Sequence, residues 1–124
     1  MNSLQQEAIN ALVEEIHLGN ISKGFYTDLT TGERLVRNIP ELICLVHSEL
    51  SEAMEGYRKN IKDDKIHHRD MIEVELADAV IRIFYLAGYL NLDLAGAMFD
   101  KLEYNKIRKD HQMENRRKIG GKKF

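Results

Sequence analysis

Two pairs of acidic residues stand at i,i+3 spacing inside segments that are otherwise rich in Leu, Ala, Val and Ile. The first pair is Glu49 and Glu52, and the second is Glu75 and Asp78. Side chains at i and i+3 of a helix point to the same side, with Cβ atoms about 5–6 Å apart. A carboxylate on an apolar helical face is unfavourable unless it is paired or binds a metal ion. Two such pairs facing each other would surround one small volume with oxygen ligands, which predicts a site for a hard cation such as Mg²⁺.

Repetition of the acidic pair is what gives the pattern its weight, because a lone i,i+3 pair is common on solvated helical surfaces. A di-iron carboxylate bundle is the main competing interpretation, and that site needs Glu-x-x-His motifs. Neither acidic pair has His at the required position. His47 precedes Glu49 by two residues, which points it to another side of the helix. We therefore favour the magnesium interpretation over di-iron.

The chain before the first acidic pair divides into a helix and a long irregular segment. A helical stripe runs from about Ser3 to Leu18 and stops at Gly19-Asn20. Residues 21–37 contain two glycines and a turn-like Thr-Thr-Gly-Glu sequence. Loops of this length in a compact helical domain are often functional.

Strong start signals mark the second helix. Asn38 is suited to the N-cap, Pro40 to the first turn, and Glu41 completes the spacing of a capping box. The helix then presents an apolar face on which Glu49 also lies. That face consists of Leu42, Leu45, Val46, Leu50, Ala53 and Tyr57.

A polar connector over residues 60–69 leads to the third helix, where Asp70 and Glu73 repeat the cap-and-box spacing. This helix is apolar nearly all round and ends near residues 88–91, so it must be buried by other helices or by another subunit. Asp93 is a plausible cap for a fourth helix that runs to about Lys109. These elements predict an all-α, four-helix-type bundle in which helices two and three carry the acidic pairs and which oligomerisation completes.

Composition sets the class of protein. A chain of 124 residues with 44% hydrophobic and 31% charged residues is one globular domain, which we place at residues 1–109. Residues 110–124 form a basic C-terminal tail with five Lys or Arg against two acids. The net charge of −2 gives no general attraction to nucleic acid or membrane. Cys44, the single cysteine, cannot form an internal disulfide, and its neighbours Ile43 and Leu45 favour a role as a small core residue. No segment resembles a signal peptide or a membrane span, so we expect a cytoplasmic protein.

Several short motifs, in order along the chain, resemble the MazG-like, all-α nucleoside triphosphate pyrophosphohydrolases. The acidic pairs match the Glu-x-x-Glu and Glu-x-x-Asp signature of that family. Two departures stand beside the match: Phe25 and Tyr26 occupy a region where the family often has tryptophan, and Ile119 a position where it often has histidine. The other matching elements are Lys23-Gly24-Phe25-Tyr26, Tyr57-Arg58-Lys59, Lys101-x-x-Tyr104-Asn105-x-x-Arg108 and Gly120-Gly121-Lys122.

This resemblance implies hydrolysis of a ribo- or deoxynucleoside triphosphate between the α and β phosphates, giving a monophosphate and pyrophosphate. It implies that Glu49, Glu52, Glu75 and Asp78 bind Mg²⁺, with Mn²⁺ as a substitute. Glu52, assisted by Glu49, is our candidate for orienting or deprotonating the attacking water. Such an enzyme would serve nucleotide-pool control or the clearance of modified nucleotides.

The resemblance also suggests how the substrate is held. Phosphate binding falls to basic and amide residues of the second and fourth helices, and base binding to residues at the end of the first helix and in the following loop. Family members assemble as dimers or dimers of dimers, so we expect a homodimer or a homotetramer. The phosphate-binding candidates are Arg58, Lys59, Lys101, Asn105 and Arg108, and the base-binding candidates are His17, Phe25 and Tyr26.

Two other functions stay open at this point. One keeps the fold and changes the substrate, to dUTP or dCTP or to phosphoribosyl-ATP. The other is a non-catalytic helical interaction module whose basic tail binds nucleic acid, although the acidic net charge of the chain gives no support to a nucleic-acid partner. Stabilisation by Mg²⁺ would separate the enzyme from the interaction module, because only a protein with a metal site gains stability from the ion.

Overall fold

The computed structural model describes all residues from 1 to 124 and is all-α, as the sequence predicts. Its only β-type pairings are two isolated bridges, Thr27 with Arg34 and Lys62 with Asp70. No helix combines the length and the apolar character that crossing a membrane requires. The helices, in chain order, are α1 (Ser3–Ser22), α2 (Ile39–Lys59), α3 (Met71–Tyr89), α4 (Leu94–Ile107), the 3₁₀ turn η1 (Lys109–His111) and the short α5 (Met113–Arg116).

Two compact units make up the chain. Leu12–Leu92 forms one of them, and Met1–Ala11 together with Asp93–Phe124 forms the other. The first turns of helix α1 belong to the unit that contains Asp93–Phe124, and its remaining turns belong to the unit Leu12–Leu92. All four carboxylates of the acidic pairs lie in the unit Leu12–Leu92.

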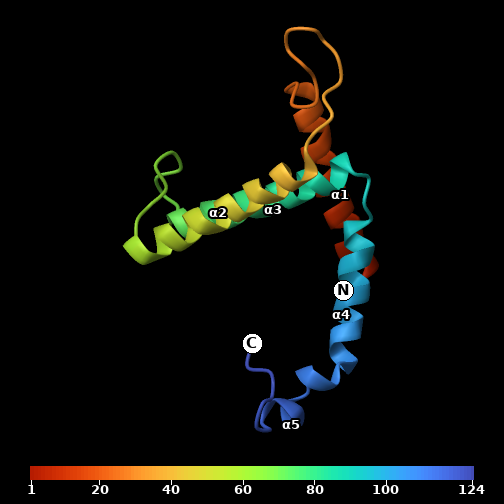
Figure 1. Cartoon of the computed structure of the whole chain (residues 1–124), viewed down its shortest axis with the longest axis vertical. Coiled ribbons are helices and arrows are strands. Elements are labelled where there is room, and N and C mark those ends of the chain that lie inside the picture. Colours follow the sequence, from red (N-terminus) through yellow and green to blue (C-terminus); the bar gives the residue numbers. More distant parts are fainter. The chain divides into compact units, whose positions relative to one another are not determined.

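Helices α2 and α3 form an antiparallel hairpin and lie side by side (Figure 1). Leu42, near the start of α2, shares a core cluster with Tyr85, near the end of α3. Further along α2, the Glu49 carboxylate pairs with the Arg82 guanidinium. The residue numbers rise on one helix as they fall on the other, so the hairpin brings the middle of α2 against the middle of α3. The two acidic pairs lie in those middle segments.

The caps of the hairpin helices agree with the sequence at one position and differ at another. Asn38 is the N-cap of α2, and its side-chain oxygen accepts a hydrogen bond from the Glu41 amide at 3.1 Å, as predicted. Asp70 is the N-cap residue of α3, but the predicted side-chain capping bond is wrong. The Asp70 carboxylate instead binds the Lys62 ammonium group at 2.5 Å. A charged partner across the connector competes successfully with the backbone amides of the first turn.

The ends of the other helices differ from the predictions by a few residues. Helix α1 continues through Gly19-Asn20 to Ser22, and the amide of Lys23 still donates to the Gly19 carbonyl at 3.1 Å. Asp93 caps α4 as predicted, since its carboxylate accepts from the Gly96 amide at 2.9 Å. Helix α4 ends at Ile107, two residues before the predicted end.

A small aromatic core closes one end of the hairpin. Tyr26, Leu42 and Tyr85 are its buried members. Helix α1 approaches α3 closely at Gly88, where an added Cβ would lie 2.7 Å from the Cβ of His17. Glycine at this position therefore allows α1 to pack against the end of α3.

Several residues predicted to be buried are exposed. Cys44 is exposed, so its predicted role as a small core residue is wrong. Leu50 and Tyr57 of the predicted apolar face are 46% and 73% exposed. The reason is geometric: only one strip of α2 contacts α3, and these side chains lie outside that strip.

Candidate functional site

The centre of the hairpin holds a group of carboxylates from both helices. Three of these residues, Glu49, Glu52 and Glu75, each present one carboxylate oxygen such that the three oxygens lie within 4.8 Å of one another. Glu49 and Glu75 are buried, whereas Glu52 is exposed. Asp78 lies outside this closest group, but like Glu49 it lines both of the cavities that open beside the group. The group therefore has two buried members and one that faces solvent.

Ionisation of the group is opposed by its own environment. The pKa of Glu75 is raised from 4.5 to about 7, first by burial and then by the neighbouring Glu49 and Glu52 carboxyls. The pKa of Asp78 is raised as well, again chiefly by burial, with repulsion from Glu49 as the next cause. A site that resists full ionisation in this way gains most from a bound cation, which would favour every carboxylate in its charged form.

Arg82 brings a positive charge next to these carboxylates. Its Nε donates to Glu49 Oε1 at 2.6 Å. The Glu49 side chain is 10% exposed and the Arg82 side chain 40% exposed. Sequence reasoning missed Arg82, although a signal existed: it stands seven residues after Glu75 and four after Asp78, so it shares their side of α3.

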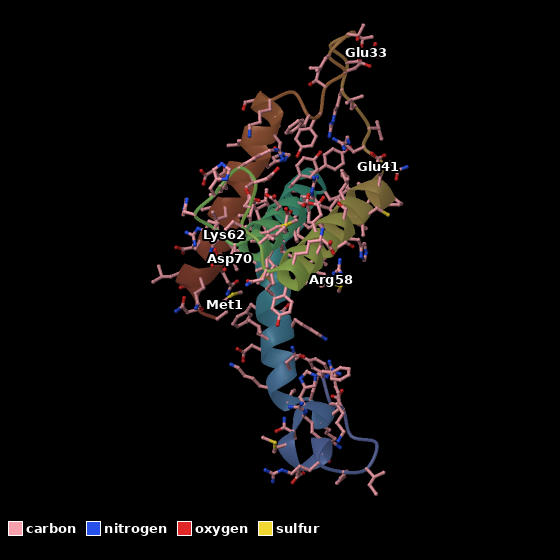
Figure 2. The ribbon with its side chains drawn as sticks, turned by 90° about the vertical axis from the view of Figure 1, so that its left-hand side faces the viewer. Met1, Glu33, Glu41, Arg58, Lys62 and Asp70 are labelled. Carbon is pink, nitrogen blue, oxygen red and sulfur yellow. The ribbon has the colours of Figure 1, made fainter.

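A cavity of 730 Å³ opens beside the carboxylates and continues under the connector between α2 and α3. The connector closes it with Asp63, whose buried carboxylate accepts hydrogen bonds from the amides of Lys65 and Ile66 at 2.9 and 2.7 Å. Lys62 also lines this cavity and is held by Asp70 (Figure 2). The cavity is therefore acidic on its helical wall, and its loop wall carries two lysines and two aspartates.

A second cavity, of 480 Å³, adjoins the first, and Glu49 and Asp78 line both. Its other walls come from the end of α1, the following loop and the core end of the hairpin. Aromatic and cationic side chains predominate among them. These residues are Asn20, Phe25, Arg37, Leu42, Ile81, Arg82 and Tyr85.

Arg37 is fixed at this second cavity by contacts to three aromatic residues. Its guanidinium donates to the Phe25 carbonyl at 3.2 Å and to the Tyr85 hydroxyl at 3.0 Å, and it lies 6.0 Å from the centroid of the Tyr85 ring. Its backbone amide donates to the Tyr89 hydroxyl at 2.9 Å. Sequence reasoning missed Arg37 because these partners lie about 50 residues away on α3.

Of the three base-binding candidates, only Phe25 lines the cavity, and its side chain is 50% exposed. Tyr26 is buried behind it, stacked on Tyr85 and Tyr89 with ring centroids 5.4 and 5.2 Å away. Burial raises the pKa of Tyr26 to about 12. His17 Nδ1 lies 3.0 Å from the Tyr26 hydroxyl. His17 and Tyr26 therefore do not line the cavity, and they instead support the residues that form its wall.

The phosphate-binding candidates of α2 are engaged with a neighbouring acid. Arg58 and Lys59 both pair with Glu55, at 2.9 and 2.8 Å, in exposed positions at the end of the helix. Neither residue lines the two cavities.

The remaining phosphate-binding candidates lie in the unit that contains Asp93–Phe124. Lys101 and Arg108 flank the Tyr104 ring, with their charged groups 5.2 and 5.8 Å from its centroid. Arg108 also pairs with Asp110 at 2.6 Å. Asn105 has a buried side-chain oxygen without a hydrogen-bond partner.

No family model, curated protein or solved structure was found to be similar to this chain. A function is therefore inferred from the geometry of the carboxylates and cavities and from the motifs that resemble those of MazG-like pyrophosphohydrolases.

Proposed function

We propose that this protein hydrolyses a nucleoside triphosphate to a monophosphate and pyrophosphate, with Mg²⁺ as its cofactor. The approach of the Glu49, Glu52 and Glu75 carboxylates to within 4.8 Å, where two cavities adjoin, is the observation that carries the proposal. A triphosphate nucleotide has two chemically distinct halves, and the two cavities offer two distinct linings. The motif resemblance to MazG-like pyrophosphohydrolases supports the same reaction.

The donor set fits Mg²⁺, which prefers oxygen ligands, and Mn²⁺ accepts the same donors. Glu49, Glu52, Glu75 and Asp78 are the residues that would hold the ion. A divalent cation at this position neutralises phosphate charge and makes the phosphorus more susceptible to attack. The raised pKa of Glu75 supports this assignment, because a cation would offset the burial and the repulsion that raise it.

The reaction requires a proton acceptor beside the attacking water. Glu52 is suited to that role, because it is the solvent-facing member of the carboxylate group. The water oxygen bonds to the α-phosphorus, and the bond from that phosphorus to the bridging oxygen breaks. The proton of the water passes to Glu52, and pyrophosphate leaves with the bonding electrons. Arg82 and Lys65, which line the two cavities, are placed to offset the charge of the phosphates.

We assign the nucleoside to the cavity of 480 Å³. The exposed Phe25 ring offers a surface on which a base can stack, and Arg37 offers donors for base or sugar oxygens. The contacts of Arg37 with Tyr85 and Phe25 hold its guanidinium in place before the substrate arrives. We expect the residues that line this cavity to determine which base is preferred.

The proposal keeps the remaining phosphate-binding candidates. Exposed ion pairs such as those of Arg58 and Lys59 with Glu55 are weak because water screens them, so both side chains can exchange Glu55 for a phosphate at little cost. By the resemblance alone, Lys101, Asn105 and Arg108 stay phosphate-binding candidates.

We further propose that a second copy of the chain completes the helical bundle. Leu76, Val80 and Ile83 of α3 recur at i, i+4 and i+7, so they lie on one side of the helix, and they are 46%, 47% and 39% exposed. A continuous apolar stripe on the hairpin that carries the carboxylates suits a self-complementary, two-fold interface. The homodimer is the smallest assembly that covers it.

Product analysis on a panel of ribo- and deoxynucleoside triphosphates, with and without Mg²⁺, tests the reaction. We expect Mg²⁺-dependent release of monophosphate and pyrophosphate. Glu52→Gln should lower kcat by at least about 100-fold, because general base catalysis contributes on the order of 10²–10⁴-fold. Glu41→Gln is the matched control, since Glu41 is an exposed acid of the same helix that lines neither cavity.

Orthophosphate as the product, or equal activity of Glu52→Gln and the unchanged protein, would contradict the proposal. A protein that neither hydrolyses any nucleotide nor gains thermal stability from Mg²⁺ would be an interaction module instead.

A further inference from the structure

The chain after α4 is built as a small folded element. Side-chain amides anchor it: Gln112 donates to the Lys106 and Arg108 carbonyls at 2.9 and 3.1 Å, and Asn115 donates to the Lys109 carbonyl at 2.6 Å. These bonds occupy carbonyl groups that the end of α4 leaves free. The final residues therefore start from a fixed support.

A close backbone approach at Gly121 folds the last residues back over α5. A Cβ added at Gly121 would lie 2.5 Å from the carbonyl oxygens of both Asn115 and Arg116. The preceding Gly120 has a φ of +77°, in the left-handed region that favours glycine. Arg116 secures the return, because its guanidinium donates to the carbonyls of Lys122 and Lys123 at 3.1 and 2.7 Å.

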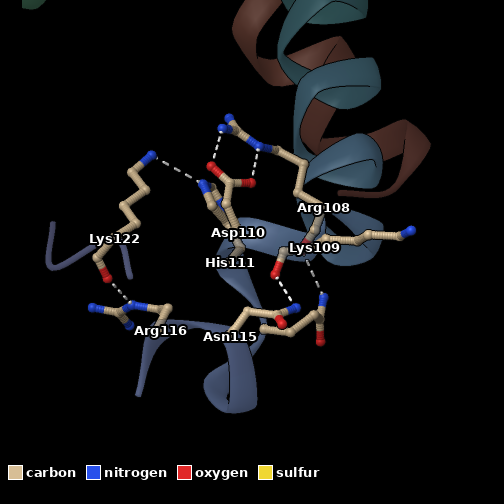
Figure 3. A network of polar contacts seen from close by, with 8 residues as sticks. Arg108, Lys109, Asp110, His111, Asn115, Arg116 and Lys122 are labelled. Atoms are coloured by element: carbon tan, nitrogen blue, oxygen red, sulfur yellow. Dashed lines mark hydrogen bonds and ion pairs between the residues drawn. The ribbon is translucent and has the colours of Figure 1, made fainter. Parts of the chain in front are cut away.

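This return brings cationic side chains around a cavity of 300 Å³, lined by His111, Arg116, Lys122 and Phe124. Lys122 Nζ lies 3.2 Å from His111 Nε2 (Figure 3). The carboxylate of Asp110, next to His111 in the chain, is taken by a two-point ion pair with Arg108, at 2.9 and 2.6 Å. Neither Arg116 nor Lys122 takes part in any ion pair of the structure. The charge around this cavity is therefore uncompensated.

We propose that this cavity, the tail pocket, binds a phosphate group of a small phosphate compound, with Lys122 and His111 as its principal ligands. Phosphate oxygens accept hydrogen bonds from the Lys122 ammonium group and from the protonated His111 ring, and they neutralise the charge of Lys122. The close approach at Gly121 and the bonds from Arg116 fix the backbone at Lys122, which lowers the entropy that binding costs. The proposal concerns the unit containing Asp93–Phe124 and does not depend on the hydrolysis proposed above.

The state of His111 gives an independent readout. Its pKa is lowered, first by desolvation and then by the charges of Arg108 and Lys122, and Lys101 adds to this while Asp110 opposes it. A bound phosphate adds negative charge next to the ring and favours the protonated form. Saturation with pyrophosphate should therefore raise the pKa of His111 in an NMR titration.

Calorimetric titration of the full chain with pyrophosphate, at low ionic strength and in EDTA, tests the pocket. Without a divalent cation the carboxylates of the hairpin repel pyrophosphate, and the tail variants separate binding in the tail pocket from binding at the other basic residues. Lys122→Met removes the charge, and we expect about tenfold weaker binding, since losing one charge-assisted contact has an effect of this order. Gly121→Ala keeps every charge and displaces Lys122, and it should weaken binding to a similar extent. Lys123→Met removes the same charge one residue away and should change the affinity less than about twofold.

Equal weakening by Lys122→Met and Lys123→Met would overturn the proposal, because it would reveal only a diffuse attraction between anions and a basic tail. Absence of pyrophosphate binding would overturn it too. A single-stranded oligothymidylate serves as the second arm and separates free phosphate compounds from a nucleic-acid backbone. Stronger binding of the oligonucleotide, with the same loss in every lysine variant, would describe a nucleic-acid surface and not this pocket.

Discussion

Glu75 is buried beside two other carboxyl groups, so burial and repulsion act on it in the same direction. The neighbouring Glu49 has the Arg82 guanidinium at 2.6 Å, whereas no ion pair involves Glu75. This difference explains why the pKa is raised at Glu75, to about 7. At the residue scale, the site is an acidic group that one arginine partly neutralises and whose full ionisation is opposed at Glu75.

The stability of the metal-free protein should therefore depend on the ionisation of Glu75. The folded state binds this proton more tightly than the unfolded state, since the pKa rises from 4.5 to about 7 on folding. The contribution of Glu75 to the free energy of unfolding is thus fully present at low pH and is lost as pH rises through about 7. In EDTA, we expect the Tm to fall between about pH 5 and pH 8, and Glu75→Gln to show a smaller fall.

Glu73→Gln is the control for this measurement, because Glu73 is an exposed acid of the same helix that pairs with Arg69. Added Mg²⁺ should reduce the fall, since a bound cation replaces the proton as the source of neutralisation. An identical pH dependence in Glu75→Gln and the unchanged protein would show that this proton does not reside on Glu75.

Sequence reasoning reached part of this arrangement. The i,i+3 spacing of the acidic residues is enough to expect carboxylates on one side of each helix, and Glu49, Glu52 and Glu75 do lie together. The contributions of Arg37 and Asp63 were missed because they depend on tertiary contacts. Arg37 is placed by tyrosines of α3, and Asp63 by the fold of the connector. No local pattern in the sequence encodes either contact.

At the scale of the elements, the sequence predicts helices well where local chemistry decides their ends. Asn38 and Asp93 both accept the capping hydrogen bonds that were predicted from their positions. Asp70 has the same sequence signal and does not cap, because Lys62 binds its carboxylate. Exposure along the helices was predicted less well: Leu50 and Cys44 face solvent because neighbouring elements, not periodicity, decide which strip of α2 is covered.

The two caps can be compared directly by mutation. Asn38→Ala removes a capping bond of 3.1 Å, which should lower the free energy of unfolding by about 1 kcal/mol. Asp70→Ala removes an exposed ion pair and no capping bond, so its effect should be smaller than that of Asn38→Ala and should shrink at high salt. Urea denaturation at low and high salt measures both. A larger, salt-independent loss in Asp70→Ala would mean that its side chain caps α3 in solution.

At the scale of the whole molecule, we expect the assembly to depend on the apolar surface that α3 leaves uncovered. The stripe formed by Leu76, Val80 and Ile83 is 39–47% exposed in the isolated chain. Burying apolar surface contributes roughly 25 cal/mol per Å², so a helical stripe pairing with its own copy has a substantial driving force. The stripe contains no charged residue that would oppose pairing of like with like. These properties favour association of two hairpins.

We therefore expect light scattering to give at least twice the chain mass of 14.4 kDa at micromolar concentration. Val80→Glu places a charge in the middle of the stripe, where burial without a partner is costly, and should shift the protein toward the monomer. Leu29→Glu is the matched control, since Leu29 is 87% exposed in the loop before α2 and its change should leave the mass unaltered. A monomeric unchanged protein would contradict the homodimer and leave the stripe to another partner. Retained hydrolysis in a monomeric Val80→Glu protein would show that one hairpin holds a complete catalytic site.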